Sequence, residues 1–471
     1  MAHHQIASFK IENKDVEYVK PSKPTPSTTL SLSTIDNRPE FLPLSQVIRV
    51  YQSQNNNTTK KIYYSKNDPA IVIKEALSKA LVYYYPLAGK LVKHHSNNNG
   101  KVTINCNEDG VPFVEAIANC DLSSLNYLDL SDIGIAKNFV YDPPFHQDEN
   151  GNQLIYPMVV KVTKFQCGGF TLGLGEPHTI ADGVGSIKIF QAIAEFATGK
   201  SEPSVKPVWE RERLNGSITK TPLLSPMDGA SAAGSPYLPS KTLVHECFKV
   251  GSESIKRLKL NLAKEIVDNN VPITNEELSF TNFESLAAYV WRARTRALKL
   301  NYDGKTMLKF AVGIRRHIDP PLPEGYYGNT IVDADVVMPV KEVNERPLSQ
   351  VVKVIREFKK VAFTKEFIKN SIDTLETRVE EFDFDGNGSC MALAEWKHLG
   401  FLRNMDFGWK EPVNVIPAPC NMFGEVSICI FFPPCDMDTS MSGGVKIYVS
   451  LPIDAMPKFR EEMKALAITI S

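Results

Sequence analysis

Short apolar runs alternate with polar turns over the first 200 residues, and two stretches instead show the apolar spacing of helices. Residues 69–82 are predicted to form a helix, because Pro69 suits a first helical turn and the apolar side chains fall on one face. Residues 184–198 have the same helical spacing. Strands are predicted at residues 44–51, 102–106, 111–118, 158–165 and 169–175. This half of the chain is therefore predicted to be a mixed α/β unit.

Residues 200–241 are rich in Ser, Pro, Gly and Thr, which is typical of a long connector. Beyond this connector the alternation of short apolar runs returns. Strands are predicted at residues 243–250, 309–314, 425–432 and 445–451. Helices are predicted at residues 252–266, 281–299, 348–378 and 454–467. The second half is therefore also predicted to be mixed α/β.

The chain has 471 residues, a length at which a single hydrophobic core stops growing, so more than one domain is expected. We predict a first domain at residues 1–200, a crossover linker at 201–241 and a second domain at 242–471. A segment near residues 380–405 is expected to pack with the first domain. Two domains of this size would leave a cleft between them.

Composition and charge exclude several classes of protein. Hydrophobic residues make up 43% of the chain and charged residues 23%, and the formal net charge is -1, so neither disorder nor a surface for nucleic acid is indicated. The N-terminus lacks a basic region followed by an apolar core, and no run approaches the roughly 18 apolar residues of a membrane span. We expect a soluble, cytoplasmic protein, and a monomer because no oligomerisation stripe is evident.

The candidate chemistry centres on His178, which precedes Asp182 by four residues and Gly183 by five. This motif falls between a predicted strand and a predicted helix, where side chains project from a rigid frame into a cleft. His178 is a candidate general base, although a lone histidine is more often a satisfied core residue. His178 and Asp182 could also be two metal ligands, but the other histidines lack ligand spacing and the eight cysteines form no Cys-x-x-Cys pair. We therefore predict no metal site.

Other motifs argue against familiar chemistries. Residues 383–388 have the opening rhythm of a calcium-binding loop, but Ala394 stands where the loop needs a bidentate Glu. No Gly-x-Ser-x-Gly elbow, dinucleotide fingerprint or P-loop occurs. The run from Asp406 to Trp409 reads Asp-Phe-Gly-Trp, yet no other kinase motif accompanies it. From its residues alone, this run is predicted to be a structural turn.

Taken together, these motifs resemble the BAHD acyltransferases, the coenzyme A-dependent acyltransferases of plant specialised metabolism. His178-x-x-x-Asp182-Gly and the later Asp406-Phe-Gly-Trp match the two signature motifs of that family in order and spacing. Three further segments are similar to family segments: residues 84–90 (Tyr-Tyr-Pro-Leu-Ala-Gly-Lys), 281–294 and 322–329. The resemblance covers nearly the whole chain.

The resemblance implies two chloramphenicol-acetyltransferase-like domains of similar size, joined by a long crossover loop, with a channel between them and His178 at its centre. It implies that His178 is the base and that Asp182 pairs with an arginine that the sequence does not identify. Asp406 is counted with His178 among the catalytic residues, and an ion pair that holds the channel wall is expected for it. The resemblance gives Gly183, Gly408 and Trp409 structural roles at the site and places Trp396 on the acceptor side.

Two positions depart from the family pattern. Lys410 replaces the glycine that usually follows the tryptophan, which suggests that this position is not essential or that no positive φ is required there. Ala394 replaces a Thr or Ser proposed to donate to the oxyanion. For the phosphates of coenzyme A, we predict Ser254, Lys256, Arg257 and Arg315 as binding residues. The resemblance implies acyl-CoA as a co-substrate and no permanently bound cofactor.

We therefore predict an enzyme that transfers an acyl group from acyl-CoA to a hydroxyl of a plant specialised metabolite. Residues 33–37 and 167–170 resemble relatives that acylate alcohols of alkaloid, terpenoid or benzylic type. One alternative is amide formation on a polyamine or other amine, whose charge would favour acidic residues at the acceptor side. Another is a non-catalytic binding protein on the same fold, against which an intact His178 argues. The sequence identifies neither the acyl group nor the acceptor.

Overall fold

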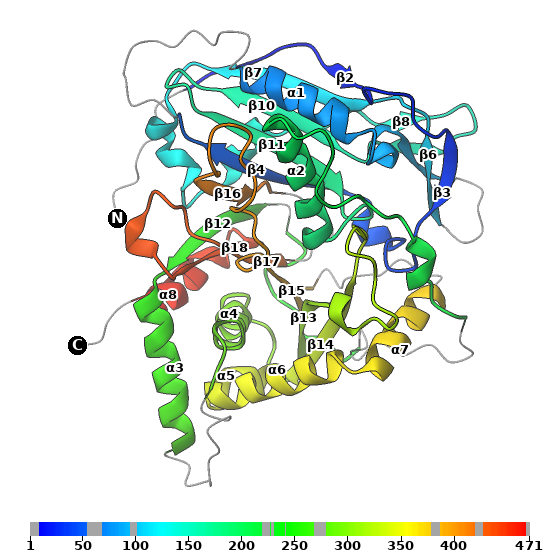
Figure 1. The fold of residues 1–471 in the computed structure, drawn as a ribbon. Coiled ribbons are helices and arrows are strands. Elements are labelled where there is room, and N and C mark those ends of the chain that lie inside the picture. The colour runs from blue at the N-terminus through cyan, green and yellow to red at the C-terminus, as the bar shows by residue number, and fades with distance from the viewer. Residues whose placement is uncertain are drawn as a thin grey trace.

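The computed structural model describes residues 9–53, 68–94, 101–218, 227, 230–240, 242–267, 279–377, 387–419 and 427–467. Within this part of the chain, three β-sheets and the helices that cover them form a mixed α/β protein (Figure 1). The calcium-like run, whose first residues are Asp383 and Asp385, begins outside the described residues.

The first sheet is built almost entirely from the first half of the chain. Its strands in spatial order are β1 (Ile11–Asn13), β7 (Val111–Ala118), β10 (Val159–Lys164), β11 (Phe170–Pro177), β4 (Leu44–Tyr51) and β16 (Asn414–Pro417), and β2 (Glu17–Val19) also pairs with β7. Helices α1 (Pro69–Ala80) and α2 (Gly183–Ala197) lie against one face, and their apolar sides pack with that face in one core (Figure 1). Strand β11 pairs with β10 on one side and with β4 on the other, both antiparallel. Its pairing with β4 continues to Pro177, so the end of the strand is fixed in place.

A smaller sheet lies at the edge of the first half. Its strands in order are β3 (Thr28–Ser31), β6 (Val102–Cys106), β5 (Lys90–Lys93), β9 (Gln153–Ile155) and β8 (His146–Gln147). All of its described pairs are antiparallel.

The second sheet comes from the second half of the chain. Its order is β12 (Leu243–Val250), β18 (Val445–Pro452), β17 (Ser427–Phe432), β15 (Cys390–Glu395), β13 (Lys305–Gly313) and β14 (Ile331–Pro339). The helices of this half are α3 (Ser252–Val267), α4 (Asn282–Ala297), α5 (Val340–Glu345), α6 (Leu348–Ala362), α7 (Lys365–Thr377) and α8 (Met456–Ala467). No helix among the described residues is both long and apolar enough to cross a membrane.

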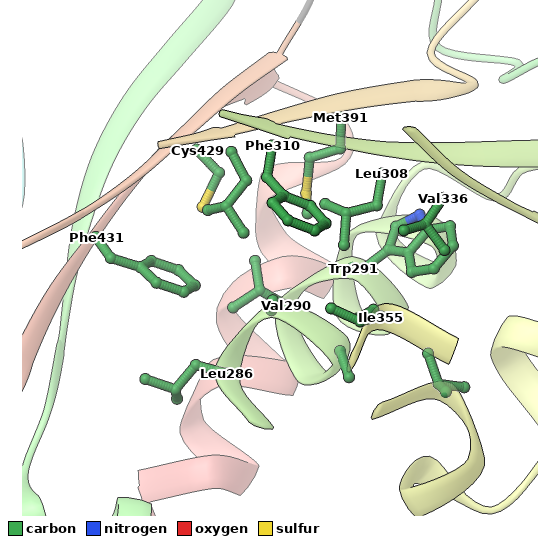
Figure 2. Packing of buried hydrophobic residues seen from close by; sticks show 14 of the residues in the cluster. Leu286, Val290, Trp291, Leu308, Phe310, Val336, Ile355, Met391, Cys429 and Phe431 are labelled. Carbon is green, nitrogen blue, oxygen red and sulfur yellow. The ribbon is translucent and has the colours of Figure 1, made fainter. Parts of the chain in front are cut away.

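Helix α4 forms the centre of the second core. Thr281 and Glu284 close its first turn with a capping box, which satisfies two backbone N–H groups that a helix start leaves free. Trp291 is fully buried between this helix and the sheet, close to Leu308 and Val336 (Figure 2). Its indole Nε1 donates a hydrogen bond of 3.1 Å to the Thr306 hydroxyl, so the ring is fixed at both its apolar and its polar side.

Most elements predicted from periodicity are confirmed, some to the residue: β4, β6, β7 and β12 have the predicted bounds. Nine strands among the described residues were not predicted, namely β1, β2, β3, β5, β8, β9, β14, β15 and β16. Strand β14 does alternate apolar and polar positions, whereas β16 is a four-residue segment whose partner among the described strands, β4, lies more than 350 residues earlier in the chain. The predicted helix at 348–378 is two helices, α6 and α7.

The two halves are not separate in their packing. Phe401, Met405 and Phe407 belong to the core of the first half, beside α1 and α2. A third apolar cluster joins Ile48 of β4 to Tyr448 of β18, and so connects the two large sheets. The domain boundaries at residues 200 and 242 remain a prediction, and the second half contributes residues near 401–417 to the first core.

The central position of Trp291 leads to a stability prediction. Replacement by alanine removes a large buried ring and leaves the Thr306 hydroxyl without its donor, so urea-induced unfolding should shift to lower denaturant by an amount equivalent to about 3–5 kcal/mol. Replacement of the half-exposed Tyr302 by alanine should change stability by less than about 0.5 kcal/mol. Equal stability of the Trp291→Ala protein and the wild type would contradict this view of the core.

Candidate active site

His178 lies where the first sheet ends and α2 begins. Strand β11 ends at Pro177, which is paired with Leu44, and α2 begins at Gly183. Five residues therefore turn the chain from strand to helix, as the sequence predicts. The imidazole stacks at a tilt on Phe41, with ring centroids 4.3 Å apart.

The surroundings of His178 favour its neutral form. Burial lowers the pKa of the imidazole below its usual value of 6.5, against the opposing attraction of Asp182, while the nearby Arg38 lowers it further. The backbone carbonyl of His178 accepts a hydrogen bond of 2.8 Å from the Asn329 side chain, which fixes the loop. At neutral pH the ring can therefore accept a proton.

Asp182 holds the loop through four groups. One carboxylate oxygen accepts from the backbone N–H of Gly185 at 2.8 Å, which caps α2. The other accepts from the backbone N–H and the hydroxyl of Thr330, at 2.9 and 2.8 Å. Arg315 lies 3.5 Å away and is the arginine that the sequence did not identify. The second half of the chain thus supplies two of the partners of Asp182.

Glycine is required at Gly185 in the first turn of α2, whereas a side chain at Gly183 would have to displace only the end of a leucine side chain. A Cβ atom on Gly185 would lie 1.9 Å from the Tyr327 carbonyl oxygen, and one on Gly183 would lie 2.6 Å from the Leu399 side chain. The first of these close contacts is with backbone and cannot be relieved by a side-chain rotation.

A second buried carboxylate, Asp36, was not recognised from the sequence as part of the site. It accepts from Arg211 Nη1 at 2.8 Å and from the backbone and side-chain N–H groups of Asn329 at 3.0 and 2.7 Å. Arg211, in the predicted crossover linker, also donates to the Ile180 carbonyl at 2.8 Å. Residues 33–37, which suggested alcohol-acylating relatives, thus form part of the scaffold beneath the His178 loop.

A cavity of about 50 Å³ opens beside His178. Its walls come from alternate residues of β4 and β11, from the start of α2 and from the segment after β15. The lining residues are Ser45, Val47, Arg49, Leu174, Glu176, His178, Ala181, Asp182, Gly183, Ser186, Phe190, Trp396 and Phe401. Trp396 therefore borders the same cavity as His178, with its ring 5.2 Å from that of Phe401.

Two charged residues of this cavity, Arg49 and Glu176, were missed by the sequence reasoning. All three guanidinium nitrogens of Arg49 are buried and have no hydrogen-bond partner among the described residues, and the same holds for Glu176 Oε2. Burial raises the pKa of Glu176 to about 7, although Ser186 and Arg49 favour its charged form. Strand alternation could have shown Glu176, because it lies two residues before His178 and so points to the same face.

Asp406 is not among the residues that line the cavity of His178, and its predicted catalytic role stays a prediction. Its carboxylate accepts from the backbone N–H of Gly408 at 2.7 Å, and the expected ion pair is not among its contacts in the described part of the chain. Trp409 packs against Phe170, at the start of β11. His178 follows the other end of that strand, roughly 25 Å away at about 3.3 Å per residue. Asp406 therefore closes a turn that packs on the first sheet.

The backbone at Lys410 contradicts one of the two interpretations of this departure from the family pattern, namely that no positive φ is required there. Its φ is +66°, and that of Gly408 is +99°, so the turn does require the left-handed region at Lys410. Lys410 therefore adopts a left-handed backbone conformation that is energetically less favourable for lysine than for glycine.

The four residues predicted to bind coenzyme A do not form one cluster. Ser254, Lys256 and Arg257 lie on α3, where Lys256 pairs with Glu253 at 2.7 Å and Arg257 donates to the Leu466 carbonyl at 2.8 Å. Arg315 instead follows β13, beside Asp182. Binding of the coenzyme by these residues remains a prediction.

Comparisons with known proteins agree with this arrangement. The profile of the Transferase family matches residues 9–466. The chain is 41% identical to spermidine coumaroyl-CoA acyltransferase of Arabidopsis thaliana over 98% of this chain and 96% of that protein. It is 39% identical to spermidine sinapoyl-CoA acyltransferase of the same plant, over 97% of each. It is 31% identical to taxadien-5-alpha-ol O-acetyltransferase of Taxus chinensis, over 95% of each.

A solved structure shares the fold. The crystal structure of vinorine synthase aligns with a TM-score of 0.70 at 21% identity, covering 97% of this chain and 98% of that one. The predicted fold class, two chloramphenicol-acetyltransferase-like halves, is thereby confirmed. Together with the family match and the loop that carries His178, this likeness shows that the chain belongs to the Transferase family, the BAHD acyltransferases.

Proposed function

We propose that this acyltransferase transfers an aromatic acyl group from acyl-CoA to an amine nitrogen of a polyamine such as spermidine. The relatives at 41% and 39% identity are both named as spermidine acyltransferases, whereas the alcohol-acylating relative is 31% identical. This proposal replaces the alcohol acceptor expected from the sequence by the amine alternative.

The observation that carries the amine assignment is the carboxylate of Glu176 in the same cavity as His178. A polyamine is positively charged at neutral pH, because alkylamines have pKa values near 10. A buried carboxylate with one free oxygen attracts such a cation, whereas an alcohol gains little from it. The sequence reasoning expected acidic residues at the mouth of the acceptor side for an amine-acylating member, whereas Glu176 is buried beside the base.

In the proposed mechanism, His178 is the general base. Its neutral imidazole takes a proton from the acceptor as the nitrogen attacks the thioester carbonyl carbon. The carbon–sulfur bond then breaks, and the proton on His178 passes to the departing thiolate. Asp182 and Asp36 act on the backbone of the loop and position the ring, without contact to the reacting atoms. Acyl-CoA supplies the acyl group as a substrate, and structures with the same fold have been solved with coenzyme A bound.

Product analysis tests the acceptor class. Purified protein should convert coumaroyl-CoA and spermidine to a coumaroyl amide, detected by mass spectrometry, with one coenzyme A thiol released per amide. Matched alcohol acceptors should give kcat/KM values at least about 10-fold lower, a difference of roughly 1.4 kcal/mol. A protein that forms esters efficiently and no amide would refute the amine assignment and restore the alcohol acceptor.

Replacement of His178 by alanine tests the base. The value of kcat should fall about 10²- to 10⁴-fold, because the nucleophile loses the group that accepts its proton. The dissociation constant for coenzyme A should stay within a factor of about three, since the ring serves as a base and not as a coenzyme ligand. Turnover equal to that of the wild type would exclude His178 as the base and leave a binding role for the cavity.

A further inference from the structure

Acylation of an amine raises a requirement that acylation of an alcohol does not. An alcohol loses one proton when its oxygen becomes an ester oxygen, and His178 can pass that proton to the leaving thiolate. A protonated amine loses two protons before it becomes an amide nitrogen. On the proposed function, His178 can accept only one of these two protons. The other is lost to solvent before binding, or it passes to a second acceptor in the site, which would allow the abundant protonated form of the amine to react.

The cavity beside His178 contains a group suited to this task. Glu176 lies on β11, two residues before His178, which directly follows the end of that strand at Pro177. Both residues line the same cavity of about 50 Å³. The Glu176 Oε2 atom is buried and accepts no hydrogen bond from the described residues, so it is free to receive a donor from a ligand. A space of this size suits the end of an aliphatic amine better than an aromatic ring, for which a cavity of about 150 Å³ is known to suffice.

The elements packed around Glu176 contribute three charged or titratable side chains. They are Arg49 on β4, Asp182 at the start of α2 and His178 itself, whereas the segment after β15 contributes the uncharged Trp396 and Phe401. Asp182 already accepts three hydrogen bonds and lies 3.5 Å from Arg315. Glu176 is therefore the carboxylate of this cavity with a vacant oxygen.

Arg49 is a second buried charged residue of this cavity. Its guanidinium lies 4.8 Å above the Phe190 ring and 5.4 Å from the Phe401 ring, and none of its nitrogens has a hydrogen-bond partner among the described residues. A fixed positive charge in a small cavity disfavours a second positive charge. It thereby favours loss of a proton from any ammonium group that enters.

We propose that Glu176 is a second base of the site, which accepts the first proton of a protonated amine acceptor, while Arg49 promotes that loss by its charge and His178 accepts the second proton. The ammonium gives one proton to the Glu176 carboxylate and becomes a neutral amine. Its lone pair forms the new carbon–nitrogen bond as the carbon–sulfur bond breaks. The second nitrogen proton passes through His178 to the thiolate, and the Glu176 carboxylic acid then releases its proton to solvent. Charge and atoms balance over the cycle.

The raised pKa of Glu176, about 7, agrees with this role. A carboxylate with an ordinary pKa near 4.3 is a much weaker base toward an ammonium group. In the wild type, kcat/KM for spermidine should fall as the pH decreases through about 7, because protonated Glu176 can no longer take the first proton.

The Glu176→Gln protein tests the inference, because glutamine keeps the shape but cannot take the proton. With coumaroyl-CoA and spermidine at pH 7.5, its kcat/KM should be about 10²-fold below that of the wild type. The deficit should shrink about tenfold per unit of increasing pH, as the neutral fraction of the amine rises. An alkoxyamine, whose nitrogen is already neutral at pH 7.5, should be acylated by both proteins at rates within about threefold of each other.

Two further variants make the test specific. The Glu176→Asp protein retains a carboxylate and should recover most of the pH profile. The control variant Glu195→Gln changes a carboxylate that pairs with Lys200 at the other end of α2, and it should behave as the wild type. Amide formation by the wild type with an equal rate and an unchanged pH profile in Glu176→Gln would overturn the role of Glu176 and leave the proposed function intact. Absence of amide formation by the wild type would overturn the proposed function and, with it, this inference.

Discussion

The loop from His178 to Asp182 depends on two buried carboxylates whose partners come from distant parts of the chain. Asp36 binds Arg211 of the crossover segment and Asn329 of the second half, and Asp182 binds Thr330 and Arg315. Buried ions are costly unless their hydrogen bonds are complete, and each of these oxygens has at least one donor. The loop that carries the imidazole is therefore complete only when both halves are docked.

Burial also sets the electrostatics of the site. His178 packs against Phe41 of the same half, and burial lowers the pKa of its imidazole, so the base is in its neutral form at neutral pH. Trp396 and Phe401 of the second half complete the cavity in which Glu176 Oε2 and the Arg49 guanidinium have no hydrogen-bond partner among the described residues. Other buried polar atoms among the described residues also have no partner, such as Tyr326 Oη and Asn344 Oδ1, but those of Arg49, Glu176 and His178 lie together in one cavity. Unmatched polar atoms gathered beside a base are better explained by a ligand than by stability.

Local signals in the sequence were sufficient for the elements and for His178. The apolar run of the strand and the helical period that begins at residue 184 predict most bounds, so the strand-to-helix junction could be predicted. The role of Asp36 could not, because its partner Arg211 is 175 residues away and lies in a segment with no periodicity. The position of Asp406 relative to His178 could not be predicted for a related reason. A motif gives the order of residues, but only the packing of Trp409 on Phe170 shows which end of β11 it meets.

The acceptor class could not be read from motifs either, since residues 33–37 serve the scaffold and not the acceptor. The most direct test of the account is the number of protons released for each coenzyme A thiol, measured with a pH indicator in weak buffer at pH 7.5. Acylation of a protonated amine should release about one proton per thiol. The ammonium group loses two protons when it becomes an amide nitrogen; the departing thiolate takes one of them, and the other goes to solvent. Release of no proton would show that a neutral hydroxyl is acylated, and would contradict the assignment of an amine acceptor.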